Sequence, residues 1–126
     1  YDPVARVGGL LHAMMPSSAI DEVKAQASPG MFVDTGIPAL FRACYALGGR
    51  KEGPLVRLAG GASIHAADDD RFQIGKRNLL MARQLFWKNG VLVHGQDVGG
   101  NTWRNMSLAM QSGEVVIRGT GSEFQL

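Results

Sequence analysis

The sequence predicts an α+β fold in which helices cover a β-sheet. Two segments, residues 35–47 and 75–89, carry apolar side chains at the spacing of an amphipathic helix. Two further segments, residues 103–110 and 115–118, flank a Gln-Ser-Gly-Glu turn, which indicates a β-hairpin. Short apolar segments that read as strands lie before, between and after the helices, at residues 4–15, 55–58 and 91–93. A chain of 126 residues with this order of elements is expected to form one domain.

The composition argues against several classes of protein. Thirteen basic and eleven acidic residues leave a net charge of +2, and the basic residues are scattered instead of clustered as in nucleic-acid-binding domains. No apolar run approaches the roughly 20 residues of a membrane-spanning helix, and no signal peptide is visible. The single cysteine excludes an intramolecular disulfide and fits a reducing compartment. We therefore expect a cytoplasmic protein with no membrane insertion and no nucleic-acid partner.

Residues 4–15 are expected to form an apolar strand that is buried on both faces. His12 is the only side chain in this segment that titrates near neutral pH. A histidine in such a place is either a core residue with a hydrogen-bond partner or a proton-transfer group, and composition leaves both open. Residues 17–31 are polar and contain Pro29-Gly30, so we expect a surface loop there, with room for one helical turn.

The helix at residues 35–47 has Asp34 as its expected N-cap and ends at Gly48-Gly49. Cys44 falls on its apolar face, whereas a catalytic thiol needs an exposed and electropositive setting. We therefore expect Cys44 to be structural. The side chains expected to be buried on this face are Ile37, Leu40, Phe41, Cys44 and Leu47.

After the strand at residues 55–58, a run of small residues would let another backbone or a substrate come close. Residues 63–71 are expected to form an exposed loop. Its tip, Asp68 to Asp70, lacks the alternating ligand spacing of a calcium-binding loop, so a solvated tip is favoured. Residues 119–126 are expected to form a tail with one turn. The helix at residues 75–89 is expected to bury Leu79, Ala82, Leu85 and Phe86.

No cofactor or metal site is indicated. Residues 48–53 have the glycine spacing of a phosphate-binding loop but continue with Pro-Leu where Lys and Ser or Thr are needed. Gly99 and Gly100 precede a strand, so a helix N-terminus for binding an anion is absent there. The three histidines are far apart and lack the paired spacing of zinc ligands. No Gly-x-Ser-x-Gly motif of a serine hydrolase is present.

Several blocks of sequence nevertheless form a recognisable series. They are Asp2-Pro3-Val4-Ala5-Arg6-Val7-Gly8-Gly9-Leu10-Leu11-His12-Ala13-Met14-Met15-Pro16, Ala59-Gly60-Gly61-Ala62-Ser63, Ile74-Gly75-Lys76-Arg77-Asn78, Gln96-Asp97-Val98-Gly99-Gly100-Asn101 and Val116-Ile117-Arg118. In content, order and spacing this series resembles the CheD family, the chemoreceptor glutamine deamidases of bacterial chemotaxis. The resemblance covers essentially the whole chain, which makes it far more specific than any single pair of glycines.

This resemblance implies a single CheD-like domain with an α/β/β/α sandwich fold. The implied activity is that of a protein-glutamine glutaminase, which hydrolyses selected glutamine side chains of methyl-accepting chemotaxis receptors to glutamate. A cysteine thiolate would attack the amide, and the histidine of the Gly-Gly-x-x-His-x-x-x-Pro pattern, here His12, would move the protons. The implied partners are the cytoplasmic helices of the receptors and the CheC phosphatase. A non-catalytic adaptor that binds both is the alternative, with residues 63–72 as a candidate contact surface.

The chain departs from the family pattern at its start. The family's nucleophilic cysteine lies in a Leu-Gly-Ser-Cys stretch a few residues before the Asp-Pro turn, and its hydroxyl-bearing partner lies further upstream. The sequence begins after both, so we expect the N-terminal strand to lie outside residues 1–126 and these residues alone to be inactive. From their places in the matching blocks, a pocket wall or partner surface is expected at Gly61, Ala62, Ser63, Asp97 and Asn101, although each could instead stabilise a turn.

Overall fold

The computed structural model describes residues 1–63 and 72–126. The expected α+β class is confirmed, with two sheets and two main helices. The two main helices are α2 (Val33–Ala46) and α3 (Ile74–Lys88), and the short helices are η1 (Ser18–Ile20), α1 (Glu22–Ala27) and η2 (Pro29–Met31). The strands are β1 (Val56–Gly60), β2 (Val93–Val98), β3 (Arg104–Leu108), β4 (Val115–Gly119) and β5 (Ser122–Gln125).

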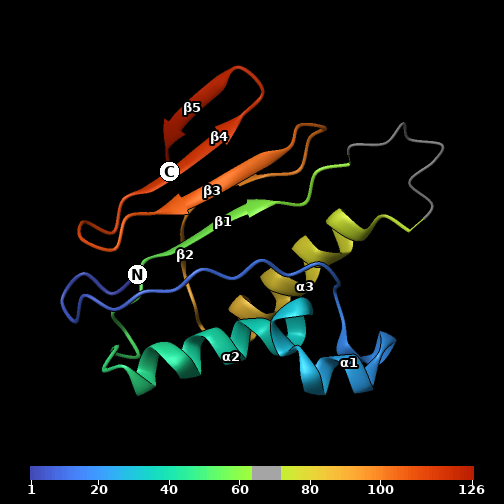
Figure 1. Cartoon of the computed structure of the whole chain (residues 1–126), viewed down its shortest axis with the longest axis horizontal. Helices are drawn as coiled ribbons and strands as arrows, with labels where there is room; N and C mark the ends of the chain where they lie inside the picture. Colours follow the sequence, from blue (N-terminus) through green and yellow to red (C-terminus); the bar gives the residue numbers. More distant parts are fainter. Residues whose placement is uncertain (64–71) are drawn as a thin grey trace.

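The strands form two sheets. Strands β1 and β2 are parallel, with Val56 opposite Val93 and Gly60 opposite Val98, and α3 connects them. Strands β3, β4 and β5 form an antiparallel sheet in that order. Figure 1 shows α2 and α3 on one side of β1, and the antiparallel sheet on the other. The β1–β2 pair thus lies between the helices and the second sheet.

The centre of the helix–sheet core is formed by Val33 of α2 with Ala82 and Phe86 of α3, which are all at least 94% buried. Ile37 and Phe41 of α2 pack against this cluster, as their expected places on the inner face require. Leu47 was wrongly placed on that face, because α2 ends at Ala46 and Leu47 follows as the C-cap, 72% exposed. Apolar side chains of β1 and β2 close the cluster from the other side.

Asp34 is not the N-cap of α2, contrary to the sequence prediction. The helix begins two residues earlier than expected, at Val33, and its N-cap is Phe32, which makes no side-chain capping hydrogen bond. The carboxylate of Asp34 instead accepts hydrogen bonds from the backbone N–H of Ser18, at 2.9 Å, and from the hydroxyls of Ser17 and Ser18. A negative charge in the first turn is favourable there, and these bonds attach η1 to the start of α2.

Two segments differ from the expected elements. Residues 17–31, expected to be mainly loop, contain three short helices, one of which starts where Asp21 accepts a hydrogen bond from the N–H of Lys24. The tail expected at residues 119–126 contains β5, which pairs with β4. No helix in the described ranges is long and apolar enough to cross a membrane.

The strand expected at residues 4–15 is not formed. Among the described residues, this segment has only isolated bridges, between Asp2 and Val7 and between Met15 and Phe32. A strand exists through its ladder of hydrogen bonds to a neighbour. The backbone groups of residues 8–13 make no hydrogen bond with any part of the chain that the structure describes. The segment therefore stays extended without being part of a sheet.

Candidate functional site

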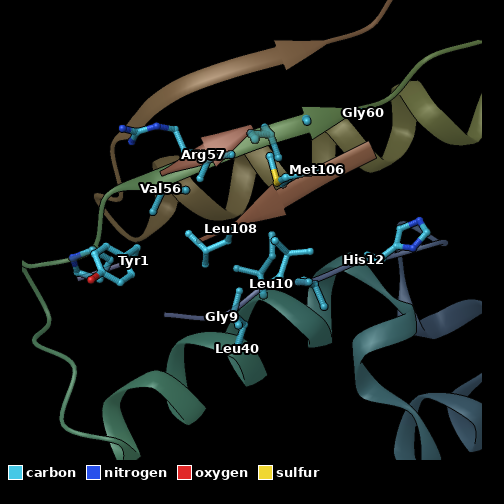
Figure 2. A pocket seen from close by; sticks show the side chains of 18 of the residues that line it. Tyr1, Gly9, Leu10, His12, Leu40, Val56, Arg57, Gly60, Met106 and Leu108 are labelled. Atoms are coloured by element: carbon cyan, nitrogen blue, oxygen red, sulfur yellow. The ribbon is translucent and has the colours of Figure 1, made fainter. Parts of the chain in front are cut away.

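A cavity of about 720 Å³ lies between the extended segment 8–13, helix α2 and strands β1 and β3. Figure 2 shows Leu10 and Leu40 on one side of it, and Val56, Met106 and Leu108 on the other. Protein interiors rarely contain voids larger than a water molecule. A largely apolar cavity of this size is therefore the first candidate for a binding site in the described part of the chain.

The segment that borders the cavity has the side-chain pattern of a strand. Leu11, Ala13 and Met15 are partly buried, whereas the intervening residues His12 and Met14 are exposed. This alternation is that of an extended chain with one face toward α2. At Gly9 the backbone approaches α2 so closely that a Cβ would lie 2.6 Å from Leu40 Cδ1. The absence of a side chain at Gly9 thus allows the segment to pack directly against α2.

The end of the segment next to His12 is attached to two helices. The N–H groups of Met14 and Met15 donate to the carbonyl of Met31, at 2.8 and 3.0 Å. From α3, the side-chain amide of Asn78 donates to the carbonyl of Met14 at 3.1 Å. The backbone two residues after His12 is therefore fixed from both sides.

His12 lies at one end of the cavity with an exposed side chain, and Figure 2 shows its ring turned away from Leu10. It makes no hydrogen bond with the described residues. This is not the environment of a core histidine, the first of the two interpretations that the sequence left open. An exposed imidazole on a fixed backbone is placed to exchange protons with a molecule bound at this end of the cavity.

The small residues at the end of β1 and directly after it border the cavity at the same end. Gly60 and Gly61 line the cavity together with His12. The loop that they begin is attached to the loop after β2, because Gly99 N–H donates to Gly60 O at 2.8 Å and Ser63 N–H donates to Gly100 O at 2.9 Å. Of the five expected wall residues, only Gly61 lines this cavity. Ala62 and Ser63 lie beside it in the chain.

Asp97 stabilises a turn, which is the alternative role that the sequence left open for it. Its carboxylate pairs with Arg104, with Nε–Oδ2 at 2.5 Å and Nη2–Oδ1 at 3.0 Å. The same guanidinium donates to the carbonyls of Gly99 and Thr102, at 2.8 and 3.1 Å. Arg104 lowers the pKa of Asp97 through these hydrogen bonds. This pair fixes the loop between β2 and β3, in which Asn101 is exposed.

The role of Arg104 was not predicted, because the sequence pattern does not show that its side chain turns back onto Asp97, Gly99 and Thr102. Arg104 is only 12% exposed, and a mostly buried arginine needs a carboxylate partner. The sequence carries a weak signal of this, since Arg104 is a charged residue inside an expected hairpin strand. Nothing in the sequence pattern identifies Asp97 as its partner.

Cys44 is partly buried on α2, in agreement with its expected structural role. Its Sγ lies 3.5 Å from the position that a Cβ at Gly9 would take, so it packs beneath the extended segment. His65 and Asp68 to Asp70 lie outside the described residues, as does most of the candidate contact surface at residues 63–72.

The family model for "CheD chemotactic sensory transduction" matches residues 14–119 of the chain. The "Probable chemoreceptor glutamine deamidase CheD 1" of Syntrophus aciditrophicus is 51% identical over 125 residues, which cover 99% of this chain and 78% of the relative. A relative with the corresponding name from Solibacter usitatus is 40% identical over 126 residues, covering 100% and 74%. One from Methanococcus maripaludis strain C5 is 36% identical over 125 residues, covering 99% and 79%. The chain belongs to the CheD family.

Proposed function

We propose that this protein hydrolyses glutamine side chains of methyl-accepting chemotaxis receptors to glutamate and releases ammonia. The relatives named as chemoreceptor glutamine deamidases support the reaction. The structural observation that carries the proposal is an exposed histidine, His12, on a fixed backbone beside a cavity with room for a further strand that would bring the nucleophile. A primary amide is unreactive, so its hydrolysis needs both a strong nucleophile and a proton donor for the leaving nitrogen.

His12 would act twice in this reaction. A cysteine thiolate attacks the carbonyl carbon of the glutamine amide, and the resulting tetrahedral intermediate collapses as His12 gives a proton to the leaving nitrogen. Ammonia departs and a thioester remains. His12 then takes a proton from a water molecule that attacks the thioester, which yields glutamate and restores the thiolate. No cofactor takes part in any of these steps.

The hydrogen bonds around Tyr1 indicate where the nucleophile would lie. Tyr1 and Leu55 exchange two backbone hydrogen bonds, at 3.2 and 2.7 Å, as an antiparallel pair does. Asp2 N–H donates to Val7 O at 2.7 Å in a second antiparallel bridge. We infer that a segment preceding Tyr1 in the whole protein runs between β1 and the extended segment, antiparallel to both, through the cavity.

The register of the Asp2–Val7 bridge can be extended along this path. The fourth residue before Tyr1 then stands opposite His12, and the sixth stands opposite Met14. Opposite residues of an antiparallel pair share a face of the sheet, and so do alternate residues along one strand. A cysteine at either position would have its thiol on the same face as His12. This fits a nucleophile a few residues upstream of the Asp-Pro turn.

The test uses the whole protein with a receptor cytoplasmic fragment as substrate. We expect His12→Ala to lower the rate of ammonia release by about 10²–10⁴-fold, the usual contribution of a general acid–base group. His94→Ala is the matched control, since His94 is also exposed but does not itself line the cavity. Mass spectrometry of the fragment identifies the converted glutamines. Normal turnover by the His12 variant would contradict the assignment.

The same variant separates catalysis from the adaptor role. A folded His12→Ala protein that captures the receptor fragment without converting it is the expected result for an enzyme. If the wild-type protein captures receptor fragments or CheC but releases no ammonia from any receptor, the adaptor function replaces the enzymatic one. CheC binding itself is measured with the purified phosphatase, and its absence would restrict the partners to receptors.

A further inference from the structure

The carboxylate of Asp2 is among the most thoroughly hydrogen-bonded side-chain groups in the described part of the chain. It is 2% exposed. Its Oδ1 accepts from the N–H groups of Val4 and Ala5, at 2.9 and 3.1 Å, and from Arg50 Nη2 at 2.9 Å. Its Oδ2 accepts from the backbone N–H and from Nε of Arg50, both at 3.0 Å. These contacts hold the pKa of Asp2 well below its usual range, mainly through Arg50.

These five bonds join parts of the chain that are distant in sequence. Val4 and Ala5 belong to the tight turn that the Asp2–Val7 bridge closes, and this turn leads into the His12 segment. Arg50 belongs to the connection between α2 and β1. At the end of this connection, five residues after Arg50, Leu55 pairs with Tyr1. Asp2 therefore fixes the turn relative to both the helix layer and the β1–β2 sheet.

We propose that the Asp2–Arg50 ion pair is a positioning device for the deamidation: it sets the register between the His12 segment and the strand that carries the nucleophile. This inference rests on the proposed function. The two strands would leave the turn in opposite directions, so the geometry of the turn sets the register in which their pairing begins. A slip of one residue would move the side chains by about 3.3 Å and place the thiol on the opposite face from His12.

Gly53 gives a way to disturb the pair without changing its charges. A Cβ at this position would collide with Asp2 Oδ2 and would lie 2.9 Å from Arg50 Nη2. The φ angle of Gly53 is not in the left-handed region, so alanine is compatible with the backbone itself. Gly53→Ala should therefore act on the ion pair alone. Gly30→Ala is the matched control, because its Cβ would meet only Leu11 Cδ1, at an ordinary 3.6 Å.

The experiment measures kcat and KM of the whole protein on a receptor fragment for Arg50→Gln, Asp2→Asn, Gly53→Ala and the double variant Asp2→Asn/Arg50→Gln. We expect kcat to fall at least tenfold in each single variant while KM changes less than twofold, because substrate binding is retained and alignment is lost. The double variant should be no slower than the slower single variant. Arg50→Lys, which keeps a charge but not the planar fork, should restore only part of the rate.

A general loss of stability is excluded with a second control. Ile117→Ala opens a cavity in β4, where Ile117 is 1% exposed, and so destabilises the protein without touching the turn. It should keep wild-type kcat at temperatures at which it is folded. Wild-type kcat in folded Arg50→Gln and Gly53→Ala proteins would overturn the positioning role and leave the proposed function intact.

Amide hydrogen exchange tests the same proposal without turnover. In the whole protein, disruption of the ion pair should speed exchange at the amides of Gly9, Leu11 and Ala13 at least tenfold, because the upstream strand would protect these alternate amides, and it should leave β4 unchanged. If the wild-type protein releases no ammonia, the proposed function fails, and this exchange measurement still decides whether the pair sets the register. Unchanged exchange at the amides of Gly9, Leu11 and Ala13 in all three single variants would overturn the positioning role of the ion pair.

Discussion

Asp97 and Arg104 show how one side-chain pair fixes irregular backbone beside a site. The guanidinium of Arg104 donates hydrogen bonds to the carboxylate of Asp97 near the end of β2 and to two carbonyls of the connection from β2 to β3. The loop that carries Gly99 and Gly100 is thereby held where it can bond to Gly60 and Ser63. The ion pair therefore acts on the cavity wall indirectly, through the backbone.

The free energy of unfolding should depend on pH in part through the Asp97–Arg104 pair. Arg104 lowers the pKa of Asp97 in the folded protein, so the folded state binds fewer protons than the unfolded state at acid pH. The pair therefore contributes stability above about pH 4, near the ordinary pKa of an aspartate, and this contribution is lost as the pH falls through the lowered pKa. Asp97→Asn should lower the free energy of unfolding by about 1–3 kcal/mol at pH 7 and flatten its decline below pH 4.

Urea denaturation at a series of pH values measures this effect. Glu123→Gln is the control, because Glu123 pairs with Arg118 on the surface, where both side chains are more than half exposed and the pair is worth little. If the free energy of unfolding of Asp97→Asn differed from that of the wild type by the same amount at every pH, the role given to the pair would be wrong.

At the residue scale, the sequence identified what local context reveals. His12 stood out because it is the one titratable group near neutral pH in an apolar segment. Cys44 was correctly assigned to a helix face because helical spacing is a local property. The role of Arg104 and the burial of Asp2 depend on partners 7 and 48 residues away in the chain, and spacing alone carries no information about such pairs.

The elements around the site depend on close backbone approach. The first turn of α3 packs against the loop after β1, where a Cβ at Gly75 would lie 2.7 Å from Ala62 O and 2.9 Å from Gly61 C. These contacts are with backbone, which cannot move aside as a flexible side chain can. The sequence predicted that the small residues at 60–63 allow another part of the backbone to come close. In the structure, the N-terminus of α3 occupies this place.

Gly75→Ala should accordingly reverse the usual effect of this substitution. Alanine in a helix is normally favoured over glycine by roughly 0.5–1 kcal/mol. Here the added methyl group would push α3 away from residues 61–62, so we expect a lower melting temperature and reduced turnover in the whole protein. The control is again Gly30→Ala, which meets no backbone. If Gly75→Ala were more stable than the wild type, the backbone at residues 61–62 would have moved to accommodate the methyl group, and this prediction would be wrong.

At the element scale, the helices and the hairpin could be predicted because their signals are contained in the segment itself. Helical periodicity placed α2 and α3 to within two residues at each end, and the Gln-Ser-Gly-Glu turn identified β3 and β4. The prediction of a strand at residues 4–15 was wrong, because the signal for a strand is not contained in the segment itself. A strand needs a neighbour on which to form its ladder, and the described chain provides none along residues 8–13.

The layers of the whole molecule explain why that neighbour matters. Within residues 1–63 and 72–126, the β1–β2 sheet has two strands, and the edge at β1 faces the extended segment across the cavity. Two strands make a marginal sheet. One more strand between β1 and residues 8–13 would hydrogen-bond to both, convert the extended segment into an edge strand, and replace the cavity by packed side chains. The same strand would bring a nucleophile to His12.

Amide hydrogen exchange in the whole protein tests this arrangement residue by residue. Asp2 N–H bonds to Val7, and alternate residues of an antiparallel strand point toward the same neighbour. The amides of Gly9, Leu11 and Ala13 should therefore be protected by the inserted strand, whereas that of His12 should exchange rapidly at the outer edge. On β1, Arg57 should be protected from the same side. Rapid exchange at Gly9, Leu11 and Ala13 alike would mean that no strand occupies the cavity, and the thiol would have to reach His12 by another path.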